Sequence, residues 1–182
     1  MIIAITGTPG TGKTSISKLL KTKGFEVVDF NKVVIENNFL IGKDKKRDSF
    51  IVDINKFNRY AKKNYSQKNI IFIEGHLSHL LTCVDKIIIL RRHPNGLKKN
   101  LSKKGWKKKK IKENLEAEIL DVILCEALDL HKSKNIFEID TTGKSIKDVF
   151  SSINEIIENK FRNMKKYNIG KIDWSEEILK DF

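Results

Sequence analysis

The first residues that could do chemistry lie in a glycine-rich stretch near the start of the chain, GTPGTGKT. It fits the pattern G-x-x-x-x-G-K-[ST] with Gly7, Gly12, Lys13 and Thr14. Glycines let backbone N–H groups turn inward around a phosphate, the lysine reaches the β- and γ-phosphates, and the Thr14 hydroxyl can hold Mg²⁺. An apolar run at residues 2–5 precedes the stretch and a helical pattern follows it. The stretch therefore predicts a phosphate-binding loop rather than a glycine turn that binds nothing.

Apolar runs rich in β-branched residues alternate with helical patterns along the rest of the chain. Together with the first run they predict five parallel strands, buried on both faces, at residues 2–5, 25–30, 69–75, 86–92 and 135–140. Helices are predicted at residues 13–23, 53–64, 111–132 and 145–165. This order is typical of an α/β fold, a three-layer α/β/α sandwich of the P-loop NTPase kind, in which ligands lie beyond the carboxyl ends of the strands.

Two stretches interrupt the alternation. Residues 34–51 are polar and predict a flap over a second substrate, while residues 102–114 predict a lid. We expect residues 1–182 to form one domain, with a small insert at about 28–51, a short lid at about 103–113 and a C-terminal tail at about 166–182. The tail has an amphipathic pattern that we expect to pack back onto the body rather than dock a partner, formed by Ile172, Trp174, Ile178 and Leu179.

The composition limits the class of protein. Lysine supplies 31 of the 36 basic residues and the net charge is +13. Because lysine is spread along the whole sequence, this charge predicts only a non-specific attraction to phosphate polymers such as RNA. Without a leader-like segment or an apolar run of about 18 residues, we expect a cytoplasmic protein with no membrane span. Cys83 and Cys125 lack metal-ligand or redox spacing, so both are expected to be small buried residues.

Several short motifs resemble one kinase family. They are TGTPGTGKT, IEGHLSHLL, LRR, KKGW and KIKENLEAEILDVILCEAL. Over roughly residues 1–160 the chain is similar to the adenylate kinase 6 family, the Fap7 or CINAP type of archaea and eukaryotic nuclei. The resemblance implies a nucleoside monophosphate kinase fold in which the insert binds the monophosphate. It also implies transfer of phosphate from ATP to AMP, hydrolysis of ATP, and action with a uS11-type ribosomal protein in small-subunit maturation.

The resemblance also implies roles for individual residues. The expected ATP contacts are Gly10, Gly12, Lys13, Thr14 and Ser15, with Lys13 also acting in catalysis. Glu74 ends the third strand, where a carboxylate can order the water shell of Mg²⁺ together with Thr14; an ordinary strand-end carboxylate near water is the alternative. His76 falls in the position of the catalytic histidine, where an imidazole could position water or the transferring group; a plain loop residue is the alternative.

Two basic positions depart from the family pattern. Lys104, an expected ATP contact, stands before the lid glycine where related kinases have arginine, and lysine lacks the forked donor that clamps phosphate. The helix at residues 31–40 offers only Lys32 where related enzymes commonly offer an arginine to the AMP phosphate.

Three arginines could replace the missing ones, namely Arg47, Arg91 and Arg92. Because Arg91 and Arg92 end the fourth strand, we expect them to contact the active site rather than solvent.

The lysine run at residues 98–112 has three interpretations: it could clamp ATP, contact pre-ribosomal RNA, or form a solvated surface, and the last is favoured for most of its lysines. Trp106, within the run, is expected to pack or stack. His79, His93 and His131 are expected to be ordinary structural residues.

These features favour an Mg²⁺-dependent adenylate kinase with ATPase activity that acts in small-subunit maturation. The alternative is an assembly factor whose ATP cycle switches its affinity for a uS11-type ribosomal protein, with kinase activity incidental. A plain RNA-binding module is disfavoured because aromatic motifs of the RNP type are missing.

Overall fold

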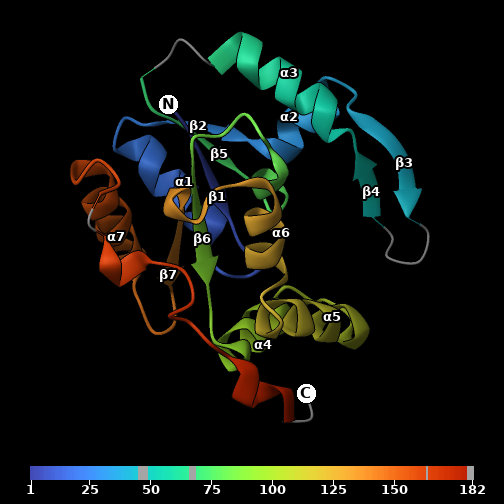
Figure 1. The fold of residues 1–182 in the computed structure, drawn as a ribbon. Coiled ribbons are helices and arrows are strands. Elements are labelled where there is room, and N and C mark those ends of the chain that lie inside the picture. Colours follow the sequence, from blue (N-terminus) through green and yellow to red (C-terminus); the bar gives the residue numbers. More distant parts are fainter. Residues whose placement is uncertain (45–48, 66–68, 163, 180–182) are drawn as a thin grey trace.

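A five-stranded parallel sheet forms the centre of the molecule (Figure 1). The computed structural model describes residues 1–44, 49–65, 69–162 and 164–179. The strands are β1 (Ile2–Thr6), β2 (Glu26–Asp29), β5 (Ile71–Glu74), β6 (Lys86–Arg91) and β7 (Ile136–Asp140), in the order β2-β5-β1-β6-β7. The expected three-layer sandwich with five parallel strands is confirmed.

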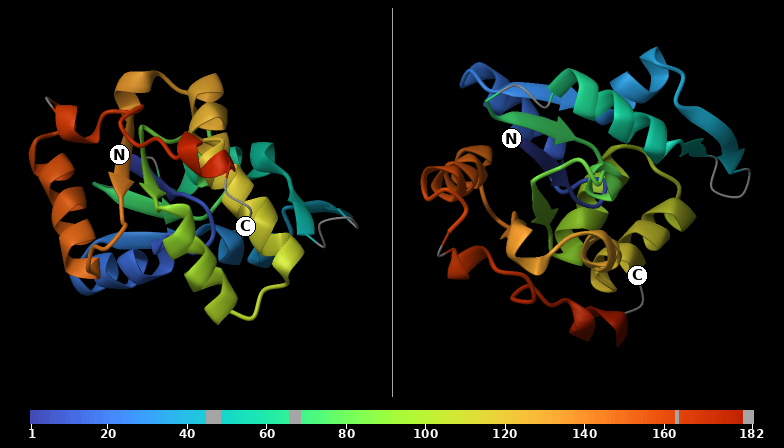
Figure 2. Two further views of the ribbon diagram at one scale, coloured as in Figure 1. Left: turned by 90° about the horizontal axis from the view of Figure 1, so that it is seen from below. Right: turned by 45° about the horizontal axis from the view of Figure 1, so that its top comes forward.

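Helices cover both faces of this sheet, as two further views show (Figure 2). On one face lie α1 (Lys13–Thr22) and α7 (Ile146–Glu158), and on the other lie α2 (Phe30–Glu36), α3 (Ile54–Tyr65) and α6 (Val122–Leu130). Helices α4 (Pro94–Lys103) and α5 (Lys108–Ile119) lie beyond the carboxyl end of β6. Single turns of 3₁₀ helix occur at Ser78–Leu80, Ser133–Asn135, Lys165–Tyr167 and Ser175–Leu179. None of the helices in these ranges has the length and apolar character needed to span a membrane.

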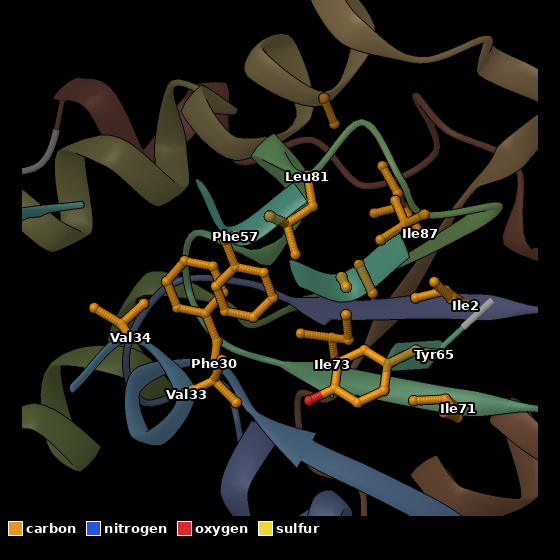
Figure 3. Packing of buried hydrophobic residues seen from close by; sticks show 14 of the residues in the cluster. Ile2, Phe30, Val33, Val34, Phe57, Tyr65, Ile71, Ile73, Leu81 and Ile87 are labelled. Carbon is orange, nitrogen blue, oxygen red and sulfur yellow. The ribbon is translucent and has the colours of Figure 1, made fainter. Parts of the chain in front are cut away.

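Each face of the sheet has its own apolar core because side chains alternate along a strand. Ile3 and Ile5 of β1 pack toward α1 and α7, whereas Ile2 packs with the cluster under α2 and α3. In that second cluster the rings of Phe30 and Phe57 stack with their centroids 4.6 Å apart (Figure 3). The phosphate loop thus follows a strand that is fully buried on both sides.

The described part of residues 34–51 forms regular secondary structure, and Arg47 lies outside the described residues. Strands β3 (Leu40–Asp44) and β4 (Ser49–Val52) pair antiparallel as a hairpin that extends away from the central sheet (Figure 1). The helix expected at residues 31–40 is α2, which ends at Glu36.

Several predictions about burial and about the ends of elements are wrong. Strand β2 is half-exposed rather than buried on both faces, because it lies at the edge of the sheet. The helix expected at residues 111–132 is broken between α5 and α6, where Asp121 takes a left-handed conformation (φ 53°) and pairs with Arg91. Helix α7 ends at Glu158 because the chain turns to bury Phe161 in the core. Cys125 is exposed on α6, while Cys83 is half-buried.

The C-terminal tail packs on the body, as expected. The Trp174 ring meets the His93 ring at 4.9 Å, and the backbone N–H of Gly170 donates to Glu138 Oε2 at 2.9 Å. Ile178, however, is exposed, and the side chain of Leu179 lies outside the described set.

The expectation that Arg91 contacts the active site is wrong, because its side chain is buried among carboxylates. Its buried guanidinium donates to Glu118 Oε1 at 2.8 Å and also pairs with Glu138 and Asp121. Burial opposes the charge, but the three carboxylates outweigh it, so the pKa of Arg91 is raised. The residue ties β6 to α5 and β7 and has a structural role.

We expect Arg91→Ala to lower the free energy of unfolding by about 3–5 kcal/mol, because Glu118 and Glu138 would be left as buried charges without their partner. Urea denaturation followed by circular dichroism measures this loss. The matched control is Arg92→Ala, since Arg92 is half-buried and the only described hydrogen bond of its side chain is a long one, 3.5 Å, to Thr141 O. Equal losses in the two variants would contradict the ion-pair account.

Candidate active site

The phosphate loop joins β1 to α1, and its glycines Gly7, Gly10 and Gly12 all have a positive φ that favours glycine. Gly7 has φ +138°, and a Cβ added there would lie 2.3 Å from the carbonyl oxygen of Leu90. Gly12 has φ +106° and caps α1, whose first N–H groups have no partner within the helix. The loop therefore passes close to β6 and then presents free N–H groups at the positive end of a helix, which is a favourable arrangement for binding phosphate.

Side chains from distant elements hold the loop in this shape. Thr8 Oγ1 donates to Glu118 Oε2 of α5 at 2.5 Å, and Thr141 Oγ1 donates to Thr11 O at 3.1 Å. Asn100 Nδ2 of α4 donates to Gly10 O at 2.8 Å. These three hydrogen bonds fix the loop to α5, to α4 and to the segment after β7.

Lys13 is buried beneath the loop that it follows. Its Nζ donates to Gly7 O at 2.6 Å and to Thr8 O at 3.1 Å. Burial lowers the pKa of Lys13 to about 8, and the nearby carboxylates of Glu74 and Glu118 only partly oppose this shift. The ammonium group is held by neutral carbonyls, so a bound anion would stabilise its positive charge more strongly than they do.

A cleft of ≈ 450 Å³ opens over the loop. Its walls contain the eight residues that were expected to bind ATP or Mg²⁺ or to act in catalysis, namely Gly10, Gly12, Lys13, Thr14, Ser15, Glu74, His76 and Lys104. Their convergence is a fact of the structure, whereas their roles remain predictions.

Glu74 ends β5 beside Ile5 of β1 and Asp29 of β2. Burial raises the pKa of Glu74, the charge of Lys13 opposes this rise, and the neighbouring Asp29 adds to it. Sequence reasoning missed Asp29, because nothing in a single sequence shows that β2 and β5 are adjacent strands.

His76 lies two residues after Glu74, on a loop that Thr6 supports from β1. Thr6 Oγ1 donates to His76 O at 3.2 Å. The imidazole is reached by solvent from the cleft, yet partial burial, followed by the charge of Lys13, lowers the pKa of His76 to about 4. The ring is therefore neutral at pH 7 and can accept a hydrogen bond.

The other three histidines have structural roles, as expected. His79 is buried between Thr6 Oγ1 at 3.1 Å and Glu126 Oε2 at 2.8 Å. The carbonyl of His79 lies 2.9 Å from His131 Nε2, and His93 caps α4 by accepting from the N–H of Asn95. None of the three lines the cleft.

The lid consists of the end of α4, a turn at Gly105 and the start of α5. Lys104 is the exposed C-cap of α4 and lines the cleft together with Lys103, which sequence reasoning had not singled out. Trp106 packs on the apolar cluster of the two helices, and the ammonium of Lys110 lies 4.4 Å from its ring centroid. Arg92 does not line the cleft, so its expected contact with the active site is not observed.

Asn100 and Asn31 also line the cleft and were not assigned to it from the sequence. A signal for Asn100 was present, because it precedes Lys104 by four residues and therefore lies on the same face of α4.

Sequence comparison relates the whole chain to archaeal kinases. A family model for the AAA domain matches residues 3–121. A protein of Methanocaldococcus jannaschii named "Putative adenylate kinase" is 41% identical over 180 residues, which cover 98% of this chain and 96% of that protein. A protein of the same name from Thermococcus gammatolerans is 42% identical over 177 residues, covering 97% of this chain and 94% of that protein. The chain belongs to this adenylate kinase family.

Solved structures agree on the fold of this family member. A shikimate kinase from Acinetobacter baumannii matches with a TM-score of 0.60 and 14% identity over 87% of this chain and 93% of that one. A thymidylate kinase from Candida albicans matches with a TM-score of 0.56 and 16% identity over 88% of this chain and 92% of that one. At such identities the similarity shows the P-loop kinase fold alone.

The residues of this adenylate kinase family member fit a nucleoside triphosphate with Mg²⁺. The Thr14 hydroxyl and the Glu74 carboxylate line the same cleft as Lys13. Within the described residues no three His, Cys, Asp or Glu side chains gather as a metal cage. Mg²⁺ commonly takes only one or two carboxylates together with substrate phosphates, so one carboxylate and one hydroxyl suffice here.

We expect the affinity of this family member for an ATP analogue to fall as the pH rises above about 8, where free Lys13 loses its proton. The loss should approach roughly tenfold per pH unit, since one proton is linked to binding. Isothermal titration calorimetry from pH 6.5 to 9.5 measures it. Lys103→Ala removes an exposed lysine of the same cleft and should keep the same pH profile. A wild-type affinity that stays constant up to pH 9.5 would contradict the role of Lys13.

Proposed function

We propose that the protein is an Mg²⁺-dependent adenylate kinase that transfers the γ-phosphoryl group of ATP to AMP and slowly hydrolyses ATP when water takes the place of AMP. The observation that carries this proposal is the convergence of Lys13, Thr14, Glu74 and His76 in one cleft over the phosphate loop. The names of relatives about 40% identical over nearly the whole chain support it.

In the transfer, the bond from the γ-phosphorus to the β–γ bridging oxygen breaks, and a bond to a phosphate oxygen of AMP forms. Lys13 would exchange the carbonyls of Gly7 and Thr8 for phosphate oxygens, so that its charge faces the group being transferred. Mg²⁺, when bound, neutralises phosphate charge. Thr14 and Glu74 would hold its coordination shell, and neutral His76 would accept a hydrogen bond from the attacking water or steady the phosphoryl group.

The acceptor would lie between the body and the insert at about residues 28–51, which includes α2 and the β3–β4 hairpin. Asn31, at the start of α2, lines the cleft and so faces the phosphate loop across it. Lys104 would close from the lid side. These placements follow the resemblance and support the choice of a monophosphate acceptor.

A second candidate function is that of an ATP-switched ribosome assembly factor that binds a uS11-type ribosomal protein and contacts pre-ribosomal RNA. The specific observation that favours it is the apolar surface of the hairpin, where Ile41 and Phe50 are 61% and 62% exposed. We place both functions in the cytoplasm. A pull-down of that ribosomal protein with ATP, with ADP and without nucleotide tests this candidate, and equal capture in all three would remove the switch.

The kinase assignment predicts rapid ADP formation with AMP or dAMP and only slow formation without an acceptor. A coupled assay with purified protein, ATP, Mg²⁺ and each monophosphate in turn measures these rates. Lys13→Ala should lose at least about 90% of the turnover, because among the described residues no other cation reaches the loop carbonyls from inside. Lys99→Ala, an exposed lysine outside the cleft, should remain active. Faster turnover with CMP or UMP would overturn the proposal.

Lys104 gives a separate prediction about the lid. Lys104→Arg supplies the forked donor that related kinases carry, so the transfer rate should rise by a few-fold if the lid closes on phosphate. Lys99→Arg makes the same chemical change outside the cleft and should leave the rate unaltered. An unchanged rate in Lys104→Arg would place this side chain outside the closed site.

A further inference from the structure

The lid carries a dense group of exposed lysines. The stretch from residue 98 to residue 112 contains no acidic residue. It carries nine exposed lysines, which are Lys98, Lys99, Lys103, Lys104, Lys107, Lys108, Lys109, Lys110 and Lys112. They lie between the middle of α4 and the first half of α5, including the turn at Gly105, so they share one region of the molecule (Figure 1). We call this region the lid surface.

The proposed nucleotide site explains only a small part of the lid surface. Lys103 and Lys104 line the cleft, whereas the other lysines do not. In the part of the chain that the structure describes, no ion pair joins an acidic side chain to Lys99, Lys107, Lys108, Lys109 or Lys112. Acidic side chains of the described residues therefore leave most of this charge without an ion-pair partner.

Several of the lysines lie in the first turn of a helix, where their charge is unfavourable. Helix α5 begins at Lys108, its N-cap Lys107 provides no side-chain hydrogen bond, and its first turn contains no acidic residue. Positive side chains at the positive end of a helix dipole are unfavourable. An anion bound over this turn would relieve that repulsion.

The chemistry of the lid surface selects one class of partner. The apolar side chains of the two helices, Leu97, Leu101, Ile111 and Leu115, are buried in their own cluster. They are therefore not available to enter a lipid surface, and the exposed lysines lack the apolar anchors that form the centre of protein interfaces. Trp106 packs on the same cluster beneath Lys110, so it offers no open platform for stacking bases. The lid surface therefore offers a group of exposed ammonium charges, which suit the phosphates of a nucleic acid.

We propose that the lid surface binds the phosphodiester backbone of a nucleic acid without reading its sequence. Because Lys103 and Lys104 also line the cleft, the nucleic acid and the nucleotide draw on the same positive charge. A bound nucleotide therefore weakens nucleic-acid binding, and the reverse holds by the same factor. This coupling rests on the proposed function, whereas the backbone contact rests on the lid surface alone.

The test is fluorescence anisotropy with a labelled single-stranded RNA, a DNA of the same sequence and a double-stranded RNA, each measured over a series of KCl concentrations. The lid variant combines Lys107→Ala, Lys108→Ala and Lys109→Ala, which are outside the cleft. The control variant changes the net charge equally on other exposed surfaces through Lys18→Ala, Lys23→Ala and Lys147→Ala. Thermal melting checks that both variants fold.

We expect the lid variant to weaken binding of at least one nucleic acid by roughly tenfold or more and to lower the salt slope by about 0.9 for each lost contact. The control variant should stay within about twofold of the wild type. The most tightly bound of the three probes identifies the kind of nucleic acid. Equal weakening in both variants would show that scattered lysine alone attracts the probe and would overturn the proposal. So would lid-dependent binding to anionic lipid vesicles with none to nucleic acid.

Addition of Mg²⁺ with a non-hydrolysable ATP analogue tests the coupling. It should weaken nucleic-acid binding by the wild type several-fold, and calorimetry in the same buffer shows whether the analogue binds. If the analogue binds without weakening the nucleic acid, the shared-charge coupling is wrong. If the analogue does not bind at all, the proposed kinase function fails while the backbone contact stands on the variant comparison.

Discussion

One buried carboxylate joins the phosphate loop to the rest of the molecule. Glu118 of α5 accepts hydrogen bonds from Thr8 Oγ1, from Arg91 Nε and from the backbone N–H of Arg92, at 2.5, 2.8 and 3.1 Å. A carboxylate can remain charged inside a protein only if it is paired, and the guanidinium of Arg91 meets that need. The loop, strand β6 and the lid helix α5 are consequently fixed to one another. This contact holds two walls of the cleft, the loop and the lid helix, in position.

The electrostatics of the cleft follow from the same construction. Lys13 lies beneath a loop whose own carbonyls hold its ammonium group, at a depth where burial lowers its pKa. Phosphate oxygens are better partners for a buried cation than neutral carbonyls, since they carry charge as well as accepting hydrogen bonds. Burial raises the pKa of Glu74 and lowers the pKa of His76, so the pKa values of an acid and a base shift in opposite directions within one cleft. Such opposed shifts are characteristic of sites that hold charged substrates and metal ions.

Local sequence patterns were sufficient for much of this picture. A short window of residues was enough to predict the loop motif, the buried runs at β1 and β5, and the helices α1 and α3. Long-range pairing was not accessible in that way. Its place at the end of a strand predicted that Arg91 would contact a substrate. Its ion-pair partners instead come from α5, β7 and the α5–α6 junction, which are far away in sequence. The break at Asp121 also lacks a periodic signal, because apolar spacing continues across it and only the pairing with Arg91 explains the turn.

A crystal structure with Mg²⁺ and a non-hydrolysable ATP analogue tests the central claim most directly. We expect the β- and γ-phosphates to lie over the loop between Gly10 and Ser15, and Lys13 Nζ to leave the carbonyls of Gly7 and Thr8 for phosphate oxygens. We also expect Glu74 to face the metal shell while Thr8 keeps its bond to Glu118. Phosphates bound elsewhere, or a Lys13 that stays on the loop carbonyls with the analogue in place, would contradict the claim.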